Sequence, residues 1–404
     1  MKKKKRAKWL KFRHRIVRNV ACAILKPYCI VKYGLKVERF KEQNGRQYLV
    51  LFNHQTGFDQ FFVGMAFKGP IYYLASEDIF SLGFISSLLR YLVAPIPIKK
   101  QTTDIQAILN CIRVAKEGGT IALAPEGNRT YSGRTEYMSP AIASLARKLK
   151  LPIAIYRIEG GYGVHPRWSD VVRKGKMRGY VAQVIEPEEY ASLSDDELFA
   201  MIEKVLYVDE AVADGNFYHK KNAEYLERVL YVCPDCGLST FESHNTTVKC
   251  LKCGKETEYL PSKELKGVGY DLPFRFVADW YNYQKDYVNN LNTLENCDTP
   301  LYDEMASIAE VVPYKKKIPL QENASVKLYG DRIVTTINED ETAFPFAEVS
   351  AVSVLGKNKL NIYHKDKIYQ LKGSKSFNAL KYVNLYYRYK NIIKGDNNVK
   401  FLGL

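Results

Sequence analysis

The sequence predicts an α/β domain with a mostly parallel sheet, followed by a small four-cysteine unit and a C-terminal antiparallel β-barrel with one helix. Three patterns lead to this prediction. Short apolar runs alternate with helix-like segments over residues 36–210, two CxxC pairs lie within 229–260, and short β runs precede one helix within 323–398. The remaining segments are a basic amphipathic lead over 1–35, a linker helix over 211–228 and a helical or irregular linker over 261–322.

The composition indicates a folded chain with one strongly basic end. Hydrophobic residues make up 46% and charged residues 26%, which argues against wholesale disorder and against a polytopic membrane protein. The formal net charge is +16, but residues 1–20 hold ten Lys or Arg and no acid, which leaves +6 for the rest. A nucleic-acid-binding protein would carry a broader basic surface, so we expect no nucleic-acid partner.

The N-terminal lead has the pattern of a helix that lies on a membrane. Trp9, Phe12, Ile16, Val20 and Ile24 are three or four residues apart and share one helical face, while most of the neighbouring cations fall outside it. Such a helix suits an anionic phospholipid surface. The apolar stretch at its end is too short for a spanning helix, and no cleavage site for a secretion signal follows. The alternative is a solvated basic tail that leads into a core helix.

The α/β segment has a clear succession of elements. Strands are expected over 48–52, 71–75, 94–98, 120–124 and 153–158, and helices over 84–92, 104–117 and 140–149, with a further helical stretch ending at Phe67. Strands and helices that alternate in this way form layers around a largely parallel sheet.

The first chemically informative segment runs from Asn53 to Asp59. His54 precedes Asp59 by five residues at the point where a strand gives way to a helix, so the carboxylate can fold back to the imidazole. Asp59 would accept a proton from one ring nitrogen, and the other nitrogen could then take a proton from a substrate hydroxyl. No Ser or Cys nucleophile adjoins the pair, which favours a base that acts directly on an alcohol. The alternative is a histidine that caps a helix beside a solvated aspartate.

The second segment is Glu126-Gly127-Asn128-Arg129-Thr130, directly after a buried strand. Gly127 would let the backbone approach a ligand closely, Arg129 can bind a phosphate through two parallel hydrogen bonds, and Thr130 adds a hydroxyl. Alone, this segment would equally fit a surface turn.

The third segment is the pair Lys99 and Lys100, which follows the strand expected over 94–98. Strand ends of this kind bind ligands in α/β folds. Alone, the pair would equally fit two solvated charges.

In this order and spacing, the segments resemble the glycerophospholipid acyltransferase family, the bacterial 1-acylglycerol-3-phosphate acyltransferases. The NHxxxxD motif of the family is matched by Asn53, His54 and Asp59, and its PEGTRS-like motif by residues 125–130. Its second motif, ending Ile-x-Arg, is matched loosely by residues 96–100, and its proline-containing apolar strand by 151–154. The resemblance covers about residues 15–210, with Asn in place of Thr in one motif and Lys in place of Arg in another.

The resemblance implies a reaction and a location. His54, oriented by Asp59, would deprotonate the free hydroxyl of a lysophosphatidate or related lysophospholipid, which would attack an acyl thioester of coenzyme A or acyl-carrier protein to give phosphatidate. The acceptor would be held by Lys99, Lys100, Glu126, Gly127, Asn128, Arg129 and Thr130. The acyl chains of acceptor and product place such an enzyme at the cytoplasmic face of the cell membrane, peripheral or monotopic.

The paired cysteines predict a structural zinc ribbon. Cys233 and Cys236 are separated by thirteen residues from Cys250 and Cys253, and two CxxC turns complete a closed tetrahedral site of four thiolates. A glycine after each second cysteine permits the tight turn. A redox pair and an iron site are the alternatives. Residues 229–260 hold four acids and three Lys or Arg, so this ribbon lacks a basic surface for nucleic acid.

The C-terminal pattern of short strands followed by a helix outlines a pleckstrin-homology-like (PH-like) half-open barrel. Strands are expected over 325–329, 332–337, 346–354, 360–364 and 367–371, and the helix over 376–392. A ribbon and a barrel also permit a second interpretation, in which the chain is a non-catalytic membrane-bound adaptor or lipid-binding protein built on a degenerate acyltransferase domain. The enzyme is favoured by the presence of His54, Asp59, Glu126, Gly127 and Arg129.

Overall fold

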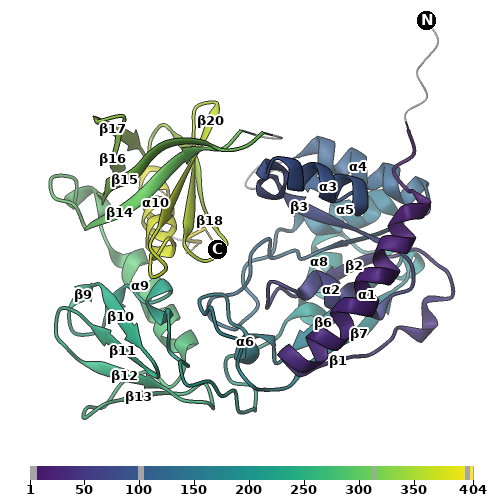
Figure 1. Cartoon of the computed structure of the whole chain (residues 1–404), viewed down its shortest axis with the longest axis horizontal. Helices are drawn as coiled ribbons and strands as arrows, with labels where there is room; N and C mark the ends of the chain where they lie inside the picture. Colours follow the sequence, from purple (N-terminus) through teal and green to yellow (C-terminus); the bar gives the residue numbers. More distant parts are fainter. Residues whose placement is uncertain (1–6, 99–103, 313–314, 396–400, 404) are drawn as a thin grey trace, which may run out of the picture. The chain divides into compact units, whose positions relative to one another are not determined.

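A computed structural model describes residues 7–98, 104–312, 315–395 and 401–403 (Figure 1). The chain forms two compact units. The first comprises the residues up to Val164 together with Lys174–Ala213, and the second comprises His165–Arg173 and Asp214–Leu404. A nine-residue segment of the N-terminal half therefore belongs to the second unit.

The first unit is built on a seven-stranded mixed sheet in the order β1-β7-β6-β2-β5-β3-β4. All neighbouring pairs run parallel except β6 and β7, which run antiparallel. The strands are β1 (Leu35–Val37), β2 (Leu49–Phe52), β3 (Ile71–Ser76), β4 (Ile96–Ile98), β5 (Thr120–Leu123), β6 (Ile153–Glu159) and β7 (Met177–Ile185). The central strand β2 is buried along its whole length, which explains its continuous apolar run. The mostly parallel α/β sheet predicted from the sequence is confirmed.

Helices connect these strands, and several have clear local start and stop signals. They are α1 (Phe12–Tyr33), η1 (Lys41–Gln43), α2 (Asp59–Ala66), η2 (Glu77–Ser81), α3 (Phe84–Leu92), α4 (Ile105–Lys116), α5 (Ala141–Leu149), α6 (Gly161–Val164), α7 (Pro187–Ala191) and α8 (Asp195–Leu206). The carboxylate of Asp104 caps α4 by accepting from the backbone N–H of Ala107. Gly118, in the left-handed region, follows the end of the same helix.

The N-terminal helix α1 packs through a different face from the apolar stripe seen in the sequence. Its buried residues are His14, Cys29 and Tyr33. Trp9, which the sequence grouped with the stripe, lies ahead of the helix and turns inward, where its indole N–H donates to the carbonyl of Ala94 at 3.0 Å. Among the residues that the structure describes, no helix has an apolar stretch long enough to cross a bilayer.

The second unit begins with two small sheets that carry the cysteines. These contain β8 (Val232–Cys233), β9 (Gly237–Leu238), β10 (Phe241–His244), β11 (Thr247–Cys250), β12 (Glu256–Tyr259) and β13 (Leu265–Gly267), and they are followed by α9 (Val277–Asn290) and η4 (Thr293–Glu295). Trp280 of α9 is buried, stacks on Phe274 and donates its indole N–H to the carbonyl of Val232. The aromatic residues of α9 therefore form the core against which the first cysteine hairpin folds.

A seven-stranded antiparallel sheet and one helix complete the second unit. The sheet order is β17-β16-β15-β14-β20-β19-β18. Its elements are β14 (Tyr302–Glu310), β15 (Ile318–Leu328), β16 (Arg332–Ile337), β17 (Asp340–Pro345), β18 (Val349–Leu355), β19 (Lys359–His364), β20 (Lys367–Gly373) and the helix α10 (Leu380–Ile393). The first strand of the sheet, β14, pairs with β15 and also with the last strand, β20, which is compatible with the predicted half-open barrel.

Two predicted segments differ from the structure. The linker helix expected over 211–228 is replaced by turns and the short η3 (Leu226–Arg228), because the side chain of Asn222 bonds the backbone of Phe217 and His219 and so competes with helical hydrogen bonds. The barrel begins at Tyr302 rather than at residue 323, because β14 and the first part of β15 occupy the expected linker. Acidic residues interrupt the alternation of β14, which hid it in the sequence.

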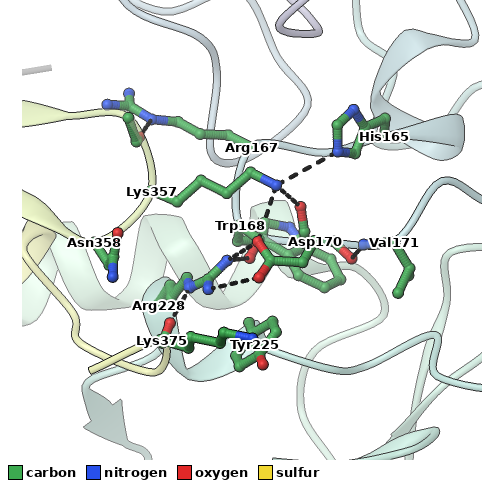
Figure 2. Close-up of polar contacts among 12 residues, drawn as sticks. His165, Arg167, Trp168, Asp170, Val171, Tyr225, Arg228, Lys357, Asn358 and Lys375 are labelled. Carbon is green, nitrogen blue, oxygen red and sulfur yellow. Dashed lines mark hydrogen bonds and ion pairs between the residues drawn. The ribbon is translucent and has the colours of Figure 1, made fainter. Parts of the chain in front are cut away.

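The segment His165–Arg173 is held in the second unit by a network of charges (Figure 2). The guanidinium of Arg228 donates to both carboxylate oxygens of Asp170, at 2.8 and 3.3 Å, and to the carbonyl of Trp168. Lys357 also bonds Asp170, at 3.0 Å. Burial by itself would raise the pKa of Asp170, but the two cations lower it to about 2. Trp168 is completely buried beside Tyr259.

Candidate active site

The site begins at the carboxyl end of β2, where Asn53 fixes the start of a loop. Its side-chain amide donates to the carbonyl of Ile158 at 2.8 Å and accepts from the backbone N–H of the same residue at 2.7 Å. Asn53 is completely buried, and the two bonds continue the pairing of β2 with β6 by one residue. The first position of the NHxxxxD pattern therefore has a structural function, since it holds the backbone from which His54 projects.

The side chains of His54 and Asp59 are in contact. His54 Nδ1 lies 2.8 Å from Asp59 Oδ2, and the imidazole is 25% exposed while the carboxylate is completely buried. A carboxylate beside Nδ1 favours the tautomer in which Nδ1 carries the proton and Nε2 is the basic nitrogen. Because Asp59 is buried, and because Phe58 is the residue at the N-cap of α2, the alternative of a capping histidine beside a solvated aspartate is wrong.

The carboxylate of Asp59 is fixed by donors from the loop that precedes it. It accepts from the backbone N–H of Gln55 at 2.6 Å, from the backbone N–H of Thr56 at 2.9 Å and from the hydroxyl of Thr56 at 2.6 Å. Asp59 is also the first residue of α2, where the helix dipole favours a negative charge. These interactions offset the cost of burying a carboxylate and leave it one orientation toward the imidazole.

Glu126 joins the second segment to the first. Its carboxylate accepts from the backbone N–H of His54 at 2.8 Å and from that of Glu136 at 3.2 Å, and the backbone N–H of Thr130 donates to the carbonyl of His54. Burial raises the pKa of Glu126 to about 8, although these backbone donors oppose the shift. The side chain of Glu126 therefore holds the backbone of His54 in place.

Of the other residues of the second segment, Thr130 stabilises its own loop, whereas Arg129 extends toward the loop that holds His54. Thr130 is buried, and its hydroxyl accepts from the backbone N–H of Gly133. Gly127 has a φ of +66°, a backbone conformation that favours glycine, and a Cβ at this position would meet no protein atom within 4 Å. Asn128 and Arg129 are partly exposed, and a Cβ at Gly57 would lie 3.9 Å from Arg129 Nη1, so the guanidinium reaches the loop between His54 and Asp59. Lys99 and Lys100 lie outside the described residues.

An aromatic cluster, which the sequence reasoning missed, lies beside the histidine loop. The rings of Phe58 and Tyr33 are 5.3 Å apart between centroids, and Tyr28 of the same helix lies 6.1 Å from Phe58. The end of α1 therefore packs against the residue that precedes Asp59. The spacing of Tyr28 and Tyr33 does not predict this contact, because it arises only when α1 folds back onto α2.

The four predicted cysteines come together in the second unit. Their sulfur atoms all lie within 4.8 Å of one another, and Cys233 Sγ is 3.8 Å from Cys253 Sγ. A tetrahedral zinc with Zn–S bonds of about 2.3 Å requires sulfurs about 3.8 Å apart, so the cluster can hold a metal ion of this kind. Gly237 and Gly254, which follow Cys236 and Cys253, have φ of +69° and +77°, as the tight turns require.

Comparison with known proteins finds a family that is similar to part of the first unit. Residues 35–158 match the family model described as Acyltransferase. This part of the chain is similar to acyltransferases. It contains His54, Asp59, Glu126 and Arg129.

Two individual proteins are similar to the chain. The 1-acyl-sn-glycerol-3-phosphate acyltransferase of Bacillus subtilis (strain 168) is 23% identical over 136 residues, which are 34% of this chain. The chain spans 65% of the length of that relative. The crystal structure of the 1-acyl-sn-glycerophosphate (LPA) acyltransferase PlsC from Thermotoga maritima aligns with 49% of this chain and 80% of that chain, at 21% identity and a TM-score of 0.40.

Proposed function

We propose that the protein transfers a fatty acyl group from an acyl thioester to the free hydroxyl of lysophosphatidate, or of a related lysophospholipid, to form phosphatidate. The observation that carries this proposal is the 2.8 Å contact of His54 with a buried, fixed Asp59 inside a segment that is similar to acyltransferases. A non-catalytic adaptor would have no need to bury a carboxylate for the orientation of one partly exposed imidazole.

In the proposed reaction, His54 acts as a general base. Asp59 keeps the proton on Nδ1, so Nε2 takes the proton of the acceptor hydroxyl as its oxygen attacks the thioester carbonyl. The C–S bond then breaks, the acyl group stays on the acceptor oxygen, and the protonated imidazole returns its proton to the departing thiolate. General-base catalysis contributes about 10²–10⁴-fold, and the positioning of two bound substrates supplies much of the remainder.

The acceptor phosphate is proposed to bind at Arg129. Its guanidinium lies next to the loop between His54 and Asp59, and a planar guanidinium can donate two parallel hydrogen bonds to a phosphate. Lys99 and Lys100, which follow β4 in the same sheet, are the proposed further cations. Glu126 contributes by holding the histidine backbone, and Gly127 and Asn128 by shaping the turn that presents Arg129.

We propose a structural zinc ion for the cysteine cluster. Cys233, Cys236, Cys250 and Cys253 would hold it, and four thiolates leave no coordination position for a substrate. When bound, the ion would supply only cross-linking, joining the hairpin β8–β9 to the turn after β11.

The membrane is the proposed location of the acceptor. Ten cations in residues 1–20, three of them within the amphipathic α1, support peripheral or monotopic binding to anionic phospholipid at the cytoplasmic face. The curled C-terminal sheet with its helix is proposed to be PH-like, since its first strand pairs with both its second and its last.

The experiment that tests the proposed reaction is a thiol-release assay with purified protein. Acyl-coenzyme A or acyl-carrier protein is supplied with a panel of lysophospholipids and glycerol phosphates. His54→Ala should abolish acceptor-dependent thiol release without changing the melting temperature, while His244→Ala, in the exposed part of β10, should keep full activity. Equal activity of the His54 variant and the wild type would refute the assignment.

A further inference from the structure

The helix α3 exposes several large apolar side chains and buries a serine. Of its nine residues only Ser86 is buried, and its hydroxyl donates to the carbonyl of Ile79 and accepts from the N–H of Leu82. Four of the exposed residues are large and apolar: Phe84 is 80% exposed, Ile85 55%, Leu88 42% and Tyr91 57%. Ser87 and Arg90 are exposed as well. Helices of soluble proteins turn such residues toward the core, so this face is suited to a partner.

The helix α1 exposes a second apolar face and is fastened to α3. Phe12, Ile16, Val20 and Ile24 of α1 are all more than half exposed, because the helix packs through its other side. Arg13 joins the two helices, since its Nε donates to the carbonyl of Tyr91 at 2.8 Å and its guanidinium lies over the Tyr91 ring. The first unit therefore presents two adjacent helices with outward apolar side chains.

The sequences that contain these helices carry an excess of cations, which favours an anionic partner. No Asp or Glu occurs in residues 1–37, which hold thirteen Lys or Arg, and none occurs in residues 79–103, which hold three. Glu117, whose carboxylate accepts from the backbone N–H groups of Trp9 and Leu10, is an acid at the start of this region. Apolar and aromatic side chains together with an excess of cations are the composition of a surface that binds anionic lipid.

We propose that α3 is a second membrane-inserting element, which docks the first unit on an anionic bilayer together with α1. The sheet topology supports this role. Because β2, β5, β3 and β4 run parallel, their carboxyl ends share one edge, and α3 follows the carboxyl end of β3 through η2. That edge also carries His54 and Arg129, so a lipid acceptor would enter from the surface where α3 inserts. The entry of a lipid acceptor at this surface rests on the proposed function, whereas the insertion of α3 into the bilayer does not.

Vesicle binding of the full chain tests the inference without any acyl transfer. Phe84→Gln with Leu88→Gln should weaken binding to phosphatidylglycerol-containing vesicles by about tenfold or more, because two large apolar side chains are lost from the inserted face. The matched control replaces two apolar residues of the second unit that are similarly exposed, Leu251→Gln with Val268→Gln, and should bind like the wild type. His54→Ala should also bind normally, so failure of the proposed reaction leaves this result intact.

A direct measurement locates the helix in the bilayer. Phe84→Trp should be quenched by brominated lipid, and Val268→Trp should not. The inference is overturned if the double variant at α3 binds vesicles as the wild type does with an unchanged melting temperature, or if quenching at position 84 is absent. It is equally overturned if the wild type is a dimer that the double variant dissociates, because the face would then be covered by a second copy.

Discussion

Replacing Asp59 with asparagine tests how the proposed catalytic pair works. Asp59 Oδ2 accepts three N–H groups, from the ring of His54 and from the backbone of Gln55 and Thr56, whereas Oδ1 faces the Thr56 hydroxyl and more weakly its N–H. In Asp59→Asn, the three donors favour the amide oxygen at the Oδ2 position. The amide nitrogen would then donate to the hydroxyl of Thr56, because that hydroxyl can accept a hydrogen bond here instead of donating one. The tautomer of His54 is therefore preserved, and only the negative charge is lost.

The size of the effect follows from this orientation. A hydrogen bond to a charged group is worth about 1–2 kcal/mol more than a neutral one, so kcat/KM should fall roughly 5- to 30-fold. The thiol-release assay at saturating donor and varied acceptor measures it, with Asp195→Asn, a carboxylate on the surface of the same unit, as control. Asp59→Ala should also lower the stability of the fold, because two buried backbone donors lose their acceptor at about 1–3 kcal/mol each. A loss of about 10⁴-fold in Asp59→Asn would indicate the wrong tautomer and refute the orientation.

Four further outcomes are expected. Arg129→Ala should raise KM for a phosphate-bearing acceptor at least tenfold, with Arg129→Lys intermediate; equal use of an acceptor without phosphate by the wild type would contradict the role of Arg129. Cys250→Ser should release about one zinc per chain and unfold residues 229–260 first, measured by metal analysis and hydrogen exchange; a metal content of zero in the wild type would exclude the zinc site. The pKa of Glu126 is raised to about 8 in the folded protein. The neutral carboxyl group therefore stabilises the fold fully below the ordinary pKa of a glutamate, and this contribution is lost as the pH rises to about 8. Glu126→Gln should therefore be less stable than the wild type at about pH 5 and lose this deficit by about pH 8.5 in thermal unfolding, and a parallel pH dependence of both proteins would argue against the shift. Removing residues 2–6 takes away five cations and spares Trp9, so binding to anionic vesicles should weaken and depend less on salt, whereas unchanged affinity would place the electrostatic contact elsewhere.

Local patterns were sufficient to predict most elements of the first sheet. The apolar runs that became β2, β3, β5 and β6 are buried strands, and the observed bounds of α3 agree with the expected ones. The strand β7 was missed because it pairs along both edges with much of its surface exposed, so it shows no continuous apolar run. Periodicity also found the apolar stripe of α1, but it could not show that the helix turns this stripe outward.

The candidate site was predictable where its contacts are local in sequence. His54 and Asp59 are five residues apart, and the loop between β2 and α2 brings them together. The contact of Glu126 with the His54 backbone spans 72 residues and depends on β2 and β5 being neighbours in the sheet. The same holds for Asn53, whose partner Ile158 lies on β6. The sequence motifs drew attention to Asn53 and Glu126, but only the order of strands in the sheet shows that both fix the backbone around His54.

The capture of His165–Arg173 by the second unit has a consequence for the synthesis of the chain. All residues of the first unit leave the ribosome by residue 213, yet Arg228 and Tyr259, which contact Trp168, are made only later. Lys357, which bonds the nearby Asp170, follows later still. During that interval a tryptophan that is completely buried in the finished protein is exposed to water in the connection between β6 and β7. Nascent chains of intermediate length are therefore the ones most in need of a chaperone. A gene cut after codon 213 would encode the whole first sheet with this tryptophan permanently uncovered.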